Sequence, residues 1–265
     1  MTDKRSNTLT ARATAAVPLI PLSSKELNKW LKTQGKATTA WIKANGFRAK
    51  PGTFCVIADR QGEIGKVIVG IDEAAPLWSY AGLPRRLPTK TYSIGTKVSP
   101  AHAEQASLGW ALGSYVFDRY KKSKKKMARL VWPEGANQDR VKATRDATFL
   151  VRDLVNTPAE DMGPAELAEA AQTLVDAHGG ELKVVVGEEL LAQNYPAIHA
   201  VGRAASRAPR LIDMRWGTEG PQITLVGKGI VFDSGGLDLK PASGMKLMKK
   251  DMGGAAHVLG VAKMV

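Results

Sequence analysis

The chain has 265 residues, of which 44% are hydrophobic and 24% charged, and it carries a formal net charge of +13 and one cysteine. A single cysteine excludes an internal disulfide framework and a cysteine-cluster zinc site, which favours a reducing compartment. The chain contains no apolar run near the ~20 residues that span a bilayer. Because two prolines interrupt the apolar part of residues 1–22 and no clean cleavage pattern follows, we predict a cytoplasmic protein.

The first elements in chain order are a tail, a helix and a hairpin. Residues 1–17 are typical of a flexible tail. Ser23 and Glu26 form a capping-box pair that begins a short helix, and Gly35 is predicted to end it. Two β-rich runs around RQGEIG then predict a hairpin, in which Cys55 lies in the apolar run TFCVIA and is expected to be a core residue.

A second helix and a strand complete the first half of the chain. Residues 99–122 have helical periodicity, and residues 128–135 read as a strand stopped by proline and glycine. We therefore predict a small, basic α/β domain over residues 1–135. The apolar face expected for the helix consists of Ala103, Ala106, Leu108, Leu112 and Val116.

The positive charge is concentrated in this first domain. Residues 1–135 hold 23 basic and 9 acidic residues, against 15 and 16 in residues 136–265, and the densest run is KKSKKKMAR at 121–129. Such a run either binds nucleic acid or another polyanion through its phosphates, or forms a solvated segment. We favour the solvated segment because no aromatic-interleaved binding motif accompanies the run.

The second half, residues 136–265, is predicted to begin with a linker helix over 136–158. A well-delimited helix over 163–180 follows, with Pro164 in its first turn and glycines at its end. Strand-like and helix-like runs then alternate, which is typical of right-handed βαβ units. We expect the first part of an α/β catalytic domain, with a mainly parallel sheet flanked by helices.

One glycine-rich segment, residues 227–254, carries an unusual number of charges: five lysines and three aspartates. It follows ITLVG (223–227), which reads as a buried strand, and it runs into an apolar helix. Since unpaired buried charge costs several kcal/mol, these side chains must pair with one another or hold an ion. Two convergent carboxylates suit a divalent cation, and a desolvated lysine beside such a cation can lose its proton and become a ligand. Spacing alone fits a structural ion-pair network equally well.

The run from Val226 to Ala256 resembles the signature of the leucyl aminopeptidase family, the two-metal cytosolic aminopeptidases of the M17 type. The matching patterns are GKG-x-x-FDSGG-x-x-x-K and M-x-x-DMGGAA. Residues 152–171, RDLVNTPAEDMGPAELAEAA, resemble the family's linker and first catalytic-domain helix. The similarity covers the chain from about residue 138 to its end, and the first domain is only loosely similar.

The resemblance implies a role for each matching position. Lys228 and Asp251 would ligate one metal ion, and Asp233 would bridge two ions. Lys240, as an ammonium, would polarise the scissile carbonyl and stabilise the oxyanion. Met248 would line the pocket for the first side chain of the substrate, with ordinary core packing as its alternative.

The resemblance also implies the chemistry and the partners. The cofactors would be two divalent ions, zinc or manganese, which activate a bridging water for hydrolysis of a peptide at its free amino end. The whole protein would be a hexameric metalloprotease, with a bicarbonate held by an arginine of the family's N-T-D-A-E-G-R segment.

That N-T-D-A-E-G-R segment, which carries the family's remaining aspartate and glutamate ligands, is absent from the 265 residues. The similar stretch NTPAE at 156–160 has proline in place of the aspartate and reads as a helix start. We therefore expect this chain to be a fragment with about half of the metal site, and to be inactive by itself.

Two hypotheses of different classes follow. The first is an aminopeptidase hydrolase of the leucyl aminopeptidase type. The second is a non-catalytic nucleic-acid-binding protein that uses the basic first domain. The histidines show no pairing at ligand spacing and are expected to be surface or satisfied core residues. They are His102, His178, His199 and His257.

Overall fold

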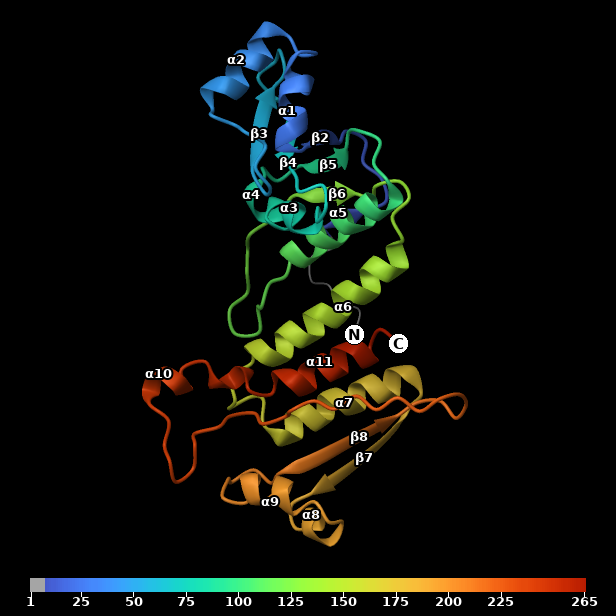
Figure 1. Cartoon of the computed structure of the whole chain (residues 1–265), viewed down its shortest axis with the longest axis vertical. Coiled ribbons are helices and arrows are strands. Elements are labelled where there is room, and N and C mark those ends of the chain that lie inside the picture. Colours follow the sequence, from blue (N-terminus) through green and yellow to red (C-terminus); the bar gives the residue numbers. More distant parts are fainter. Residues whose placement is uncertain (1–7) are drawn as a thin grey trace. The chain divides into compact units, whose positions relative to one another are not determined.

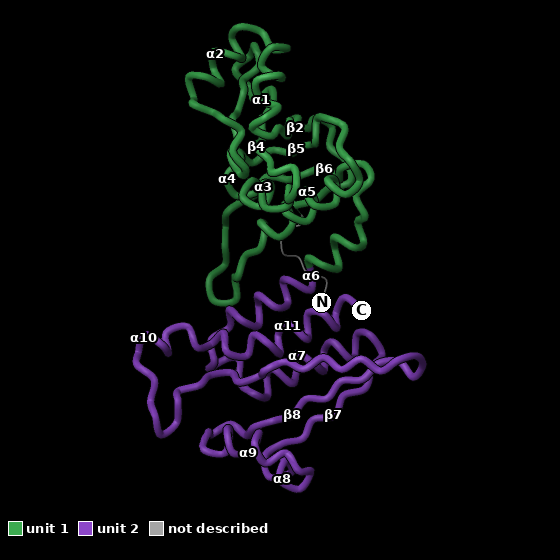
Figure 2. Tube along the Cα trace, viewed as in Figure 1, with its two compact units in different colours: residues 1–145 green, residues 146–265 purple. Residues whose placement is uncertain are grey.

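The computed structural model describes residues 8–265, and the chain divides into two compact units, Met1–Arg145 and Asp146–Val265 (Figure 2). The division lies within α6 (Gln138–Asn156), the helix predicted between the two halves of the chain. The domain boundary expected after residue 135 stays a prediction. Among the described residues, no helix is both long and apolar enough to cross a membrane.

Unit 1 is built on a six-stranded sheet with the order β1-β6-β5-β2-β4-β3, in which only the β3–β4 pair is antiparallel. Its strands are β1 (Leu9–Thr10), β2 (Val17–Leu22), β3 (Phe54–Ala58), β4 (Ile64–Gly70), β5 (Thr91–Ile94) and β6 (Arg129–Val131). Its helices are α1 (Ser24–Leu31), α2 (Lys36–Ala44), α3 (Leu77–Ala81), α4 (Leu83–Arg86) and α5 (Pro100–Gly113). The predicted α/β class is confirmed, and the chain does contain a mainly parallel sheet flanked by helices, but this sheet lies in unit 1 and not in the second half, where we expected it.

Successive side chains of β4 point to opposite faces of the sheet, and unit 1 has one apolar cluster on each face. Val67 and Val69 pack with Trp110 of α5, whereas Ile68 packs with residues of α1 and α2. This is the period of two expected for a strand that is covered on both faces. Cys55 is buried in the second cluster, as predicted, and burial raises the pKa of its thiol.

The predicted tail over residues 1–17 is wrong for its described part. Leu9 and Thr10 form β1, which pairs in parallel with β6, and Leu9 is only 2% exposed. A two-residue strand carries too little pattern to be recognised from sequence, and the pairing with β6 depends on contacts more than a hundred residues away. Residues 1–7 lie outside the described part of the chain.

The predicted capping box at the start of α1 is confirmed. The Glu26 carboxylate accepts hydrogen bonds from the Ser23 backbone N–H at 2.8 Å and from the Ser23 hydroxyl at 3.0 Å. The expected end of this helix is wrong, because α1 ends at Leu31 and Gly35 is instead the N-cap of α2. The sequence reasoning missed α2, whose N-cap glycine offers no side-chain oxygen to mark the start of a helix.

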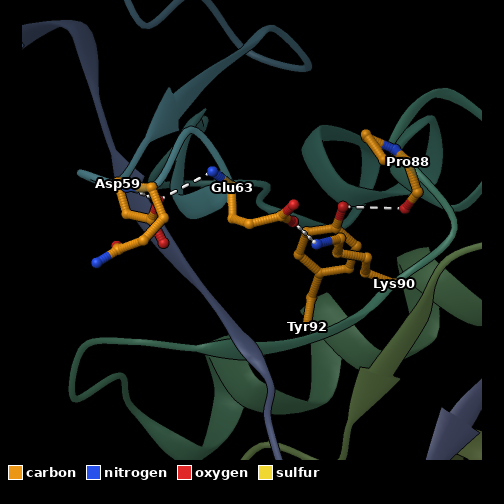
Figure 3. Close-up of polar contacts among 6 residues, drawn as sticks. Asp59, Glu63, Pro88, Lys90 and Tyr92 are labelled. Carbon is orange, nitrogen blue, oxygen red and sulfur yellow. Dashed lines mark hydrogen bonds and ion pairs between the residues drawn. The ribbon is translucent and has the colours of Figure 1, made fainter.

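The predicted hairpin is confirmed as β3 and β4, and its turn is tied to β5. Asp59 Oδ1 accepts from the backbone N–H groups of Gln61 and Glu63, each at 2.9 Å. Figure 3 shows the Glu63 carboxylate reaching Lys90, with a 2.7 Å ion pair, just before β5 begins. Beside this pair, the Tyr92 hydroxyl donates to the Pro88 carbonyl at 2.9 Å, and burial raises its pKa to about 12.

The predicted long helix over 99–122 exists but ends at Gly113, as α5. Ala103, Ala106 and Leu112 are buried and Leu108 is partly buried, but Val116 lies beyond the helix, in an irregular segment. Trp110 and Ala111 are also buried, so α5 is covered on more than one side. A narrow apolar face is therefore a poor description of this helix.

Unit 2 is built around three helices that share one apolar core. The last part of α6 packs with α7 (Pro164–His178) and α11 (Gly253–Ala262) through Leu154, Leu174 and Leu259, among others. The remaining elements are β7 (Glu181–Val186), α8 (Glu189–Ala192), α9 (Pro196–Gly202), β8 (Arg210–Arg215), α10 (Ala242–Met245) and the 3₁₀ turn η1 (Met248–Lys250) (Figure 1). The start of α7 with Pro164 in its first turn and its end at a left-handed Gly179 are confirmed.

The parallel sheet expected in this second half is not what the described residues form. The strands β7 and β8 pair antiparallel, and their connection contains only the short helices α8 and α9. The Gly187 N–H donates to the Pro209 carbonyl at 3.0 Å, so the chain returns beside the point where it left β7. A parallel pair would need a crossover that runs back along the whole strand.

The strand predicted at 223–227 is also wrong. These residues form no strand, and the Ile223 and Val226 side chains are 81% and 89% exposed. An apolar extended run becomes a strand only when a neighbouring strand supplies its hydrogen bonds. Within residues 8–265, the sheet of unit 2 contains only β7 and β8, and the 223–227 run does not pair with either of them.

We expect Gly109→Ala to destabilise unit 1, because a Cβ at this position would lie 2.1 Å from the Leu77 carbonyl oxygen, in a close contact between α5 and α3. Forcing a methyl group into a packed core costs about 1–3 kcal/mol, which denaturant unfolding can measure. Gly82→Ala is the matched control, since its Cβ would meet only the Arg86 side chain, at 3.6 Å. Equal stability of the two variants would contradict the close approach of α3 and α5.

Candidate metal centre

The charged segment is anchored by a close backbone contact with the start of α11. The Ala255 N–H donates to the Lys228 carbonyl at 2.9 Å. A Cβ at Gly227 would lie 2.5 Å from the Gly254 carbonyl oxygen, and one at Gly254 would lie 2.7 Å from the Lys228 nitrogen. Glycine at both positions therefore allows residues 227–228 to lie directly against the first turn of this helix.

This contact brings Lys228 to Asp251, the first of two ion pairs. Lys228 Nζ donates to Asp251 Oδ2 at 2.8 Å, and the Asp251 side chain is only 16% exposed. Asp251 directly follows η1, and its N–H donates to the Met248 carbonyl at 2.8 Å. The lysine and the aspartate predicted to share one metal ion thus lie within hydrogen-bond distance of each other.

Asp233 and Lys240 form the second ion pair, across the glycine turn. Asp233 Oδ2 accepts from Lys240 Nζ, and Asp233 Oδ1 accepts from the Gly235 N–H at 2.9 Å. The Lys240 N–H donates to the Ser234 carbonyl at 2.9 Å, which closes the loop. Gly235 and Gly236 both have positive φ, +95° and +68°, which other residues rarely adopt.

The two ion pairs influence each other. The pKa of Asp233 lies below its ordinary value, first because of the hydrogen bond from Lys240, then because of the Gly235 N–H, with a smaller contribution from the positive charge of Lys228. Lys228 therefore acts on Asp233 as well as on Asp251. Four of the predicted site residues, Lys228, Asp233, Lys240 and Asp251, belong to one electrostatic cluster.

The donor set of this cluster fits a divalent cation only in part. It offers two carboxylates and one lysine amine, which suit a borderline or hard cation. Within residues 8–265, no group of three or more histidine, cysteine, aspartate or glutamate side chains is placed to hold a metal ion. Three donors are fewer than the four of a closed zinc site.

The fifth predicted residue, Met248, begins η1 and is partly buried. Its backbone carbonyl supports Asp251 through the hydrogen bond already described. The role of its side chain in a substrate pocket stays a prediction.

Sequence reasoning missed the next residue, Lys249. Its Nζ donates to the backbone carbonyl of Asn156, the last residue of α6, at 2.7 Å. No spacing pattern relates two positions 93 residues apart, and a lysine beside another lysine reads as part of a solvated run. Only the fold shows that one of the pair is bonded to a helix end.

Three of the histidines have partners away from the cluster. His102 Nε2 lies 2.8 Å from the Tyr80 hydroxyl, and its pKa is lowered mainly by burial. His199 lies 3.0 Å from Glu188, and His257 Nδ1 lies 2.6 Å from the Gly253 carbonyl of its own helix. These contacts agree with the predicted surface and core roles.

Sequence comparison matches two family descriptions to the two halves of the chain. Residues 17–133 match the M17 aminopeptidase N-terminal domain, and residues 149–265 match the catalytic domain of the cytosol aminopeptidase family. A probable cytosol aminopeptidase of Methylobacterium radiotolerans is 39% identical over 182 residues, which are 63% of this chain and 36% of that protein. The chain thus spans about a third of the length of this curated relative.

Comparison with solved structures gives the same result as the sequence comparison. The chain is similar to the cytosol aminopeptidase of Coxiella burnetii with a TM-score of 0.90 and 41% identity, over 98% of this chain and 57% of that one. It is also similar to the bottromycin maturation enzyme BotP, solved in complex with Mn, with a TM-score of 0.74 and 28% identity, over 95% and 56% of the two chains. Both similarities extend over the two units described above.

We expect Gly235→Ala to open the loop that holds Asp233. Its φ of +95° is strained for alanine, and its Cβ would lie 2.1 Å from the Asp238 carbonyl oxygen. Amide exchange of Lys240, whose N–H bonds to Ser234, should therefore speed up about tenfold. Gly244→Ala is the control, because its Cβ would meet nothing closer than 3.8 Å. Unchanged exchange at Lys240 in the Gly235 variant would show that the loop does not need glycine.

Proposed function

This chain belongs to the cytosol aminopeptidase (M17) family, and on that basis we propose that it is part of a metal-dependent aminopeptidase that removes N-terminal residues from peptides. The observation that carries the proposal is the 2.8 Å ion pair of Lys228 with Asp251, together with the Asp233–Lys240 pair, in which the charge of Lys228 also acts on Asp233. All four residues stand at the family's signature positions. A relative solved with Mn supports metal dependence.

Lys228, Asp233 and Asp251 are the residues that would hold the metal. When bound, divalent ions would supply an activated water and a Lewis acid for the peptide carbonyl. The Lys228 ammonium donates a hydrogen bond to Asp251, and it would have to lose a proton before its nitrogen could act as a metal ligand. Asp233 accepts from Lys240 on one oxygen and from the Gly235 N–H on the other, and each oxygen would keep a lone pair for a metal ion.

Lys240 has the role of an electrostatic group. Its ammonium is held by the Asp233 carboxylate and by the loop closure to Ser234, so its position is fixed before a substrate arrives. A fixed ammonium beside a peptide carbonyl stabilises the negative charge that develops on the oxygen. The reaction class is therefore hydrolysis of the amide bond next to a free amino terminus.

Membership of the family implies further properties of the whole protein, and we include these properties in the proposal. The described donors would form part of a two-ion site for zinc or manganese, and the further carboxylate ligands would come from the family's N-T-D-A-E-G-R segment, which these 265 residues do not contain. A bicarbonate-binding arginine, a hexameric assembly and a cytoplasmic location belong to the same proposal. The 265-residue chain alone is accordingly expected to have no peptidase activity.

A second candidate function, nucleic-acid binding, is favoured by one observation in unit 1. Residues 115–128 form no helix or strand, and their lysines at 121–126 are exposed beside Tyr120, which is 56% exposed and lies 5.9 Å from the Arg119 guanidinium. A basic segment with an exposed aromatic side chain can bind single-stranded nucleic acid by charge and stacking. Salt-dependent binding to random DNA, lost when these lysines are replaced, would favour this function over a solvated loop.

The aminopeptidase proposal is tested by Asp251→Ala in the natural gene product that contains these residues. Removing a metal ligand should lower kcat/KM for leucine amide by more than about a hundredfold, since even outer-shell changes at metal sites cost 10–100-fold. The measurement is leucine release in the presence of Mn²⁺ or Zn²⁺.

Glu219→Gln is the matched control, because this carboxylate is an exposed acid in a loop of the same unit. Its activity should equal that of the unmodified protein. Near-normal turnover by the Asp251 variant would contradict the assignment of Asp251 as a metal ligand.

A further inference from the structure

Lys249 connects the segment that carries Asp251 to the end of α6. Its Nζ donates to the Asn156 carbonyl at 2.7 Å, in a partly buried hydrogen bond. The last carbonyl groups of a helix have no partner within the helix, and the negative end of the helix dipole attracts a cation. A lysine at this place therefore satisfies a helix end and is itself held by it.

The position of Asp251 depends on what holds the residues on either side of it. On one side, Lys249 lies within η1 and is bonded to α6, and η1 is closed by the Lys250 and Asp251 N–H groups, which donate to the carbonyls of Leu247 and Met248. On the other side, Met252 is fully buried in the core that α6, α7 and α11 share. Asp251 is thus held between a polar anchor and an apolar anchor.

The neighbouring lysine shows that this arrangement is specific to position 249. Lys250 is exposed, whereas Lys249 is partly buried, and with three residues per turn of a 3₁₀ helix the two side chains leave the helix about 120° apart. Both carry the same charge and lie within two residues of Asp251. They differ in whether they are bonded to the helix end.

We propose that Lys249 is a positioning residue, which directs the Asp251 carboxylate toward Lys228 by fixing η1 to the C-terminus of α6. This proposal depends on the proposed function in one respect only, the role of Asp251 as a metal ligand. Its structural part concerns the Lys249–Asn156 hydrogen bond and the order of residues 247–251, whatever the protein does.

The structural part is tested by amide hydrogen exchange in Lys249→Met. Loss of the anchor should speed exchange of the Lys250 and Asp251 amides about tenfold, while the amides of β7 and β8 exchange as before. Lys249→Arg should restore slow exchange, because arginine keeps the charge and can donate to the same carbonyl. Lys250→Met removes the same charge from the adjacent position and should leave the exchange unchanged.

Two results would overturn the proposal. One is exchange at Asp251 within about twofold of the unmodified chain, a change too small for a lost anchor. The other is an equal increase in β7 and β8, which would mean that Lys249 contributes only general stability. If Lys249→Met does not fold, Lys249→Ala also removes the donor, and the same comparison applies to it.

Binding of Mn²⁺ to the 265-residue chain is the second readout. Lys249→Met should weaken binding about tenfold although it removes a repelling positive charge, and Lys250→Met should not weaken it. Equal affinity of the unmodified chain and Lys249→Met would overturn the link between Lys249 and the metal site. Failure of the unmodified chain to bind Mn²⁺ would instead count against the metal site in the proposed function, and the exchange comparison would still decide the role of Lys249.

Discussion

The candidate site depends on one close approach, the backbone of Gly227 and Lys228 lying against the first turn of α11. Hydrogen bonding between Ala255 and Lys228 holds the two segments together, and the absence of side chains at Gly227 and Gly254 permits the distance. Without this contact, Lys228 would have no reason to meet Asp251, because 23 residues separate them along the chain. The glycines of the signature thus act on the charges indirectly, by setting the path of the backbone.

Charge balance is the second constraint, and it accounts for two of the five lysines in residues 227–254. Each aspartate of the cluster is paired with one lysine, Asp251 with Lys228 and Asp233 with Lys240. Ion pairs with this degree of exposure stabilise a fold little, because water and salt screen the attraction and two long side chains must be ordered. These ion pairs instead hold the carboxylates and amines in fixed positions. A divalent cation bound there would supply the positive charge that the lysine ammonium now supplies.

The sequence alone left two hypotheses open, an ion-pair network and a metal site. The same arrangement of the four side chains fits both. The pairing of two aspartates with two lysines is present in the described residues, and the family membership makes a metal site the better interpretation of its purpose. The anchoring of η1 through Lys249 and Met252 belongs to the same design, since a ligand must be held by a rigid backbone to bind an ion at a defined distance.

The sequence by itself determined the local features: the capping box of Ser23 and Glu26, the β3–β4 hairpin and the Pro164-to-Gly179 limits of α7. It also singled out Lys228, Asp233, Lys240 and Asp251, which the structure joins in two ion pairs and whose roles at a metal site stay a prediction. Each depends on side chains within a few positions or on a signature read in one run. The tertiary structure alone decided that Leu9 and Thr10 form a strand, that β7 and β8 run antiparallel, that residues 223–227 form no strand, and that Lys249 meets Asn156. The physical reason is that strand pairing and helix-end contacts join residues that lie far apart in the chain. The sequence pattern around one of these residues does not identify the other.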